Sequence, residues 1–180
     1  MWEFAGTREA RRSGQAVWWA DQLYRRVRTR ARWARLWSVL TGRSHSLLQL
    51  SAVEARCRVR SRHWAGTRTV PIRHIRGSED RCGDFDADFR PLRGHNRQRW
   101  VGIATAWELG AALPPVELVQ IGDLYFVRDG HHRISVGRAM GQEHIEAEVT
   151  VWEVVGPLPW EQRVELARPL PVGNLAAQPA

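Results

Sequence analysis

Apolar residues recur at helical spacing between residues 15 and 40, and this is the first strong pattern along the chain. The predicted apolar face consists of Ala20, Leu23, Val27, Ala34 and Trp37, with Tyr24 and Ala31 beside them. The opposite side is polar and mostly basic, with Asp21, Arg25, Arg28, Arg32 and Arg35. A second helical pattern over residues 46–56 begins after two serines, which are typical of helix starts. We expect these two helices to form a helical hairpin.

The pattern changes after residue 66, where short β-type runs alternate with shorter helical ones. Branched apolar residues predict strands over residues 67–75, 116–121, 124–128 and 144–155. Gly122 and Asp123 form a hairpin turn between the second and third of these strands. Helical spacing predicts helices over residues 96–109 and 134–140, each followed by a glycine. From residue 156 the chain is rich in proline and shows little pattern, apart from one turn of helix expected near residues 160–166.

Charge separates the first third of the chain from the rest. All 27 basic residues are arginine, and residues 1–62 hold 14 of them against four acidic residues. Residues 63–180 hold 13 arginines against 15 acidic residues, so they are close to neutral. The basic stripe has three interpretations: phosphate contacts on DNA, contact with anionic lipid, or a solvated helix face whose arginine stems cover tryptophan rings. Solvated faces of this kind are the most common of the three.

Several classes of protein are not indicated by the sequence. No apolar run approaches the roughly eighteen residues of a membrane span, and the N-terminus lacks a signal-peptide pattern. Cys57 and Cys82 show neither metal-knuckle nor disulfide spacing. We therefore expect a cytoplasmic protein. Asp84, Asp86 and Asp88 alternate in a loop, but the surrounding residues do not fit a calcium loop, so a turn-forming role is favoured.

The most informative stretch is the corner formed by Asp129, Gly130, His131, His132 and Arg133, between a strand and a helix. A helix N-terminus offers unpaired amide hydrogens and a partial positive charge, which together favour an anion. The glycine permits a sharp turn, and the arginine could bind phosphate oxygens in a bidentate manner. A purely structural alternative stays open, in which the aspartate caps the helix and the histidines serve packing.

The segment of residues 113–149, "LPPVELVQIGDLYFVRDGHHRISVGRAMGQEHIEAEV", resembles the core of the ParB/sulfiredoxin superfamily. The upstream residues 70–79, "VPIRHIRGSE", resemble the first strand of that family and the loop that follows it. The resemblance spans about residues 67–152. It implies an α+β fold with a small mixed sheet, and nucleotide phosphates held by Gly130, His131, His132 and Arg133. The chain then divides into a basic helical extension (1–62), a ParB/sulfiredoxin-like domain (63–155) and a Pro-rich tail (156–180).

The branches of this superfamily have different chemistries. Sulfiredoxins use a cysteine at the position of His131, and an imidazole cannot replace that thiolate, so reductase activity is disfavoured. The partition protein ParB binds CTP at a similar turn, but it continues into DNA-binding and dimerisation regions that this chain is too short to contain. Free-serine kinases carry the most similar turn, D-G-H-T-R.

The kinase-type resemblance implies specific roles for several residues. It places Glu79 as a candidate base, with Asp129 and His131 as further catalytic residues and Mg²⁺ beside ATP or CTP. The first hypothesis is therefore an ATP- or CTP-dependent phosphotransferase or hydrolase. The alternative is a non-catalytic module, related to ParB, whose arginine-rich N-terminal helices bind DNA or a protein.

Overall fold

The computed structural model describes residues 3–42 and 44–160, and side chains from residue 10 onward. Its elements are α1 (Glu3–Thr41), β1 (Leu48–Gln49), α2 (Leu50–Glu54), β2 (Arg58–Pro71), η1 (Ile72–His74), β3 (Ile75–Ser78), η2 (Gly94–Asn96), α3 (Arg97–Glu108), β4 (Val116–Ile121), β5 (Leu124–Asp129), α4 (His131–Ala139) and β6 (His144–Val155). The fold class is α+β, as the sequence predicted. No helix within the described residues is long and apolar enough to cross a bilayer.

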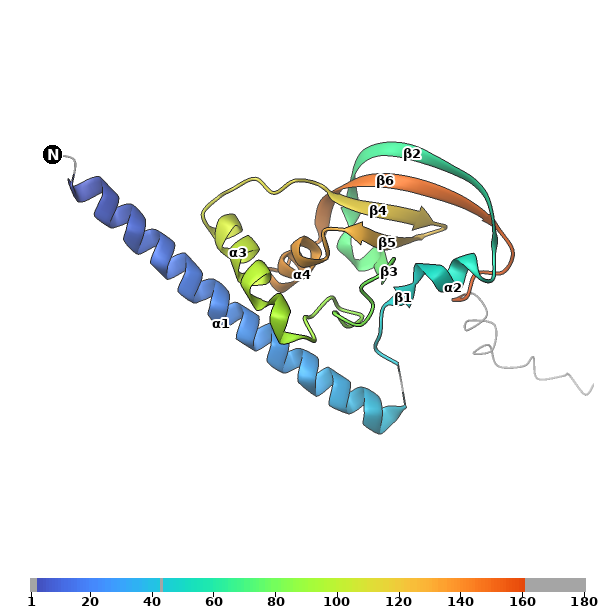
Figure 1. Cartoon of the computed structure of the whole chain (residues 1–180), viewed down its shortest axis with the longest axis horizontal. Helices are drawn as coiled ribbons and strands as arrows, with labels where there is room; N and C mark the ends of the chain where they lie inside the picture. Colours follow the sequence, from blue (N-terminus) through green and yellow to red (C-terminus); the bar gives the residue numbers. More distant parts are fainter. Residues whose placement is uncertain (1–2, 43, 161–180) are drawn as a thin grey trace, which may run out of the picture.

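The strands form one mixed sheet in the order β1-β3-β5-β4-β6-β2. The pairs β1–β3, β3–β5 and β4–β6 are parallel, whereas β4–β5 and β2–β6 are antiparallel. In Figure 1, β2 and β6 form a long curved ribbon at one edge of the sheet. The central pair β4–β5 is a tight hairpin whose turn lies at Gly122 and Asp123, as the sequence predicted, and Gly122 has a positive φ.

Apolar side chains of the central strands point alternately to the two faces of the sheet, and both faces are buried. Val116 and Leu118 of β4 pack in the cluster that includes Ile134 of α4, whereas Val119 and Ile121 point to the other face. There they meet a second cluster that contains Leu50 and Val53 of α2. The helices α3 and α4 lie between the sheet and α1 (Figure 1).

Helix α1 is held on the domain by a third cluster. Its residues Ala20, Tyr24 and Val27 pack with Trp100 of α3 and Val136 of α4. The predicted helix over residues 15–40 is confirmed and extends further towards the N-terminus. The predicted apolar face is only partly confirmed. Ala20 and Val27 are buried, as are Tyr24 and Ala31 beside them, whereas Trp37 is exposed.

Three of the predicted element boundaries are wrong. Residues 46–56 form β1 and the short α2 instead of one helix, so there is no helical hairpin, and the segment is drawn onto the sheet by burial of Leu50 and Val53. The strand predicted over residues 67–75 begins at Arg58 and ends at Pro71, with η1 and β3 following it. Helix α4 begins at His131, three residues earlier than expected. The predicted turn of helix near residues 160–166 lies almost wholly outside the described residues.

The predicted helix over residues 96–109 and the predicted strands over residues 116–121, 124–128 and 144–155 are confirmed. Helix α3 occupies Arg97–Glu108, and Gly110 beyond its end has φ +82°. The strands β4 and β6 coincide with the predicted ranges, and β5 is one residue longer. The residues of the predicted strand–turn–helix corner therefore stand at the end of a central strand, where β5 meets α4.

Candidate functional site

The corner between β5 and α4 turns within a single residue, Gly130. This glycine has φ +97°, a left-handed conformation that side chains disfavour. A Cβ atom at this position would lie 2.5 Å from Cγ1 of Val116, on the neighbouring strand β4. Both the backbone conformation and the contact therefore require glycine, and the helix begins directly at the edge of the sheet.

The first turn of α4 borders a small cavity. The cavity has a volume of about 130 Å³ and is lined by Asp80, Arg81, Arg99, Ile103, Arg128, Asp129, Gly130, His131, His132 and Arg133. We call it the turn cavity. Its lining comes from four places: the loop after β3, helix α3, the end of β5 and the start of α4. All the residues predicted to hold the phosphates are thus brought together, whereas the predicted base Glu79 is not part of the lining.

Both histidines of the corner are buried beneath the turn. His131 and His132 are 3% and 4% exposed, and their rings lie 5.9 Å and 5.3 Å from the ring of Phe85. His131 shares a 2.7 Å hydrogen bond between its Nε2 and Oγ of Ser78. Oγ of Ser78 also accepts a hydrogen bond from the backbone N–H of Arg81. His131 therefore ties the loop after β3 to the start of α4.

Burial lowers the pKa of each histidine to about 4. The nearby guanidinium of Arg81 lowers both pKa values further, and Arg99 contributes at His132. Both rings are therefore neutral near pH 7 and add no positive charge to the cavity. Nδ1 of His132 is buried and has no hydrogen-bond partner within the described part of the chain.

Three of the four arginines that line the cavity are already bound to acidic groups. Arg81 pairs with Asp84, Arg128 pairs with Glu79 at 3.1 Å, and Arg133 pairs with Asp129. Arg133 also donates to the backbone oxygens of Pro114 and Pro115, at 2.7 Å and 2.6 Å. Its side chain is 13% exposed, so it holds the segment before β4 against the corner.

Arg99 of α3 differs from these three arginines. Across residues 10–42 and 44–160, its side chain has neither an ion pair nor a hydrogen bond. The same holds for Asp80, whose charge acts on His131 through space. Sequence reasoning missed both residues, because Arg99 lies on a helix 30 residues upstream of the corner and Asp80 stands one position after the predicted Glu79.

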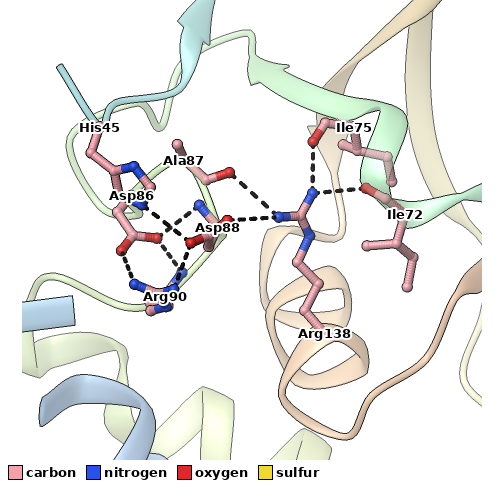
Figure 2. Close-up of polar contacts among 8 residues, drawn as sticks. All are labelled: His45, Ile72, Ile75, Asp86, Ala87, Asp88, Arg90 and Arg138. Carbon is pink, nitrogen blue, oxygen red and sulfur yellow. Dashed lines mark hydrogen bonds and ion pairs between the residues drawn. The ribbon is translucent and has the colours of Figure 1, made fainter. Parts of the chain in front are cut away.

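Arg138 and the aspartates near it anchor the loop after β3, as Figure 2 shows. Arg138 of α4 donates to the backbone oxygens of Ile72 and Ile75, and lies 3.6 Å from Asp88. Asp86 accepts hydrogen bonds from the backbone N–H groups of Asp88 and Arg90, which closes a turn. The predicted turn-forming role is confirmed for Asp86, whereas the carboxylates of Asp84 and Asp88 form ion pairs with arginines. No group of three or more potential metal ligands occurs among the described residues.

The two cysteines lie outside the turn cavity. Cys82 is half-buried beside Ser78, and burial raises the pKa of its thiol. Cys57 is buried on the opposite face of the sheet, in the cluster beneath α2. Neither thiol stands where a ligand in the turn cavity would meet it.

Comparison with known proteins adds little beyond the fold. No protein-family model and no curated protein matches the sequence. Among solved structures, the chain is similar to sulfiredoxin from Arabidopsis thaliana, with 14% sequence identity and a TM-score of 0.33. The similarity covers 57% of this chain and 98% of that one. At this level no residue role is transferred, and the case for function depends on the site itself.

Acidification should weaken the fold through the buried histidines. Each has a pKa near 4 in the folded state and about 6.5 when unfolded, so the unfolded chain binds more protons between these values. The free energy of unfolding should therefore fall as the pH drops below 6.5, by about 2 kcal/mol per histidine between pH 7 and pH 5. Urea unfolding at a series of pH values measures this slope.

A matched pair of variants tests whether the buried histidines cause this dependence of the free energy of unfolding on pH. His132→Leu should lose about half of it, whereas His63→Gln, on the exposed strand β2, should retain all of it. An unchanged slope in His132→Leu would show that His132 does not titrate as described.

The corner should not tolerate a side chain at Gly130. Gly130→Ala combines a left-handed backbone with the contact to Val116, so we expect a loss of about 2–4 kcal/mol in the free energy of unfolding. Gly141→Ala is the control, because Gly141 has φ +78° but no atom within 4 Å of an added Cβ. It should cost only about 1–2 kcal/mol. If both variants lost the same free energy of unfolding, the contact with Val116 would not be what requires glycine at position 130.

Proposed function

We propose that the turn cavity binds the phosphate groups of a nucleoside triphosphate, ATP or CTP. The observation that carries this proposal is the guanidinium of Arg99, which lines the same cavity as the first turn of α4 and has no ion pair or side-chain hydrogen bond within the described residues. A fork of N–H donors and a helix N-terminus both favour phosphate oxygens. Gly130 supports the same ligand indirectly, because its left-handed backbone lets α4 begin directly at the cavity, where the first amides of a helix lack intrahelical partners.

The dimensions of the cavity limit what it encloses. Sites that surround a whole drug-sized ligand measure roughly 300–1,000 Å³. The turn cavity, at about 130 Å³, accommodates phosphate groups, and the nucleoside would lie over the adjacent surface. Such a site distinguishes nucleotides mainly by phosphate number, which is why ATP and CTP remain equal candidates.

A phosphotransferase or hydrolase needs a carboxylate that accepts a proton and a metal ion that bridges the phosphates. Asp80 and Asp129 both line the cavity, and Mg²⁺ is commonly held by one or two carboxylates together with the phosphates. Asp80 is the stronger candidate for the base because it has no ion-pair partner within the described residues. The roles proposed for Glu79 and His131 have weaker support, since each is bound to another side chain.

The alternative is a non-catalytic module in which the same cavity holds a nucleotide without turnover. The pairing of Arg81, Arg128 and Arg133 with acidic groups supports it, because those ion pairs leave few free charges for a transition state. Binding and turnover are therefore tested separately.

Binding should depend on Arg99. In a thermal-shift assay with ATP, CTP, GTP, ADP or inorganic phosphate, with and without Mg²⁺, the triphosphates should stabilise the wild-type protein. Arg99→Gln should weaken that binding by about tenfold or more, because it removes a charged hydrogen-bond donor. Arg60→Gln is the control, since Arg60 is exposed on β2 and the charge change is identical. A full panel without any shift, or an Arg99→Gln variant that binds as well as wild type, would rule out this site.

Turnover should depend on the carboxylates of the cavity. If the wild-type protein releases phosphate from ATP or CTP in the presence of Mg²⁺, Asp80→Asn should lower the rate by about a hundredfold, the contribution of a general base. Glu79→Gln should lower it less than threefold, because Glu79 does not line the cavity. The reverse order would assign the base to Glu79. Nucleotide binding without any phosphate release would favour the non-catalytic module.

A further inference from the structure

The C-terminal half of α1 carries a second surface that the turn cavity does not explain. Beyond Ala31, the last of its buried residues, the helix exposes five large apolar side chains: Trp33, Leu36, Trp37, Val39 and Leu40. Trp33 and Trp37 are 67% and 69% exposed, and Leu40 is 70% exposed. In Figure 1 both ends of α1 extend beyond α3, and this cluster occupies the end that leads to β1.

Four of these side chains share one face. Trp33, Leu36, Trp37 and Leu40 are spaced by three or four residues, which places them together on an α-helix. At about 100° per residue, this face points roughly 180° away from Ala31 and hence from the domain. We call it the Trp–Leu face. A flat partner could approach it without meeting the sheet or the other helices.

The surroundings of the Trp–Leu face are basic. No acidic residue occurs between Asp21 and Glu54, although seven arginines do. None of the ion pairs among the described residues involves Arg26, Arg30, Arg32 or Arg35. At about 100° per residue, Arg26, Arg30 and Arg32 lie within roughly 90° of the centre of the apolar face, whereas Arg35 lies on the side of Ala31. The result is an apolar strip with unpaired positive charge beside it.

We propose that the Trp–Leu face binds the surface of an anionic lipid bilayer. A helix with tryptophan and leucine on one face and arginine beside them lies in the membrane interface, with its apolar side chains inserted and its charges at the headgroups. The aliphatic residues favour this partner over nucleic acid, since leucine has no ring that could stack on a base. The unpaired positive charge opposes a second copy of the same helix at this face.

The test uses the full chain and vesicles of defined composition. Co-sedimentation with phosphatidylcholine vesicles containing 30% phosphatidylglycerol should show binding, and pure phosphatidylcholine should bind at least tenfold more weakly. Binding should weaken as the salt concentration rises, because part of it is electrostatic. Equal binding to neutral vesicles, or no binding to either, would overturn the proposal.

Two pairs of variants separate the apolar and the basic contributions. Trp37→Ser should lower vesicle affinity about tenfold, whereas Trp64→Ser, which changes a tryptophan of 70% exposure on β2, should leave it unchanged. Arg26→Gln with Arg32→Gln should lower it about tenfold, whereas Arg58→Gln with Arg60→Gln should have little effect. Circular dichroism should show that all four proteins are folded. If the control variants lost as much vesicle affinity, the Trp–Leu face would not be the lipid-binding surface.

Two further measurements would reveal a different partner. If duplex or single-stranded DNA binds more tightly than the anionic vesicles, and the arginine pair on α1 is required, the face is a nucleic-acid surface. If sedimentation velocity shows a dimer that Trp37→Ser dissociates, the face is an interface between copies. Either result would replace the lipid proposal.

Discussion

The structure around the candidate site depends on a steric constraint at Gly130, where a strand must end and a helix must begin within one residue. The contact with Val116 fixes how closely β4 approaches the corner. Because the helix starts at once, His131 and His132 lie in its first turn and are directed beneath the loop after β3, where Phe85 covers them. The same geometry turns Arg133 back towards Pro114 and Pro115. In the proposed phosphate site, such a corner would offer backbone amides to the ligand, while most of its side chains hold the corner together.

Because most side chains of the corner form internal contacts, only part of the site could be predicted from the sequence. The motif of residues 129–133 marked a strand–helix corner, and the structure places these five residues around the turn cavity. It could not reveal that Arg133 is held by backbone oxygens, since residues 114 and 115 become neighbours only when β4 pairs with β5. Nor could it identify Arg99 or Asp80, which reach the cavity through the packing of α3 and the path of the loop.

The fold was predictable where local pattern and tertiary packing agree. The hairpin of β4 and β5, helix α3 and strand β6 show clear periodicity and clear turn residues, and their predicted positions are confirmed. The prediction failed over residues 46–56, where a helical pattern is overridden by pairing of Leu48 and Gln49 with β3. It also failed to separate the two apolar faces of α1, because tryptophan and alanine at helical spacing do not indicate which face meets the domain.

The distribution of paired and unpaired arginines separates the two surfaces physically. At the turn cavity, carboxylates neutralise three of the four guanidinium groups. The remaining positive charge is confined to Arg99, and a single anion would be sufficient to balance it. Such an arrangement selects by geometry, because hydrogen bonds between fixed donors and fixed acceptors depend on position. On α1 the guanidinium groups of Arg26, Arg30, Arg32 and Arg35 are in no ion pair among the described residues, so their attraction adds up over many weak, screened contacts. A surface of that kind recognises the density of charge, which a bilayer supplies and a single small ligand does not.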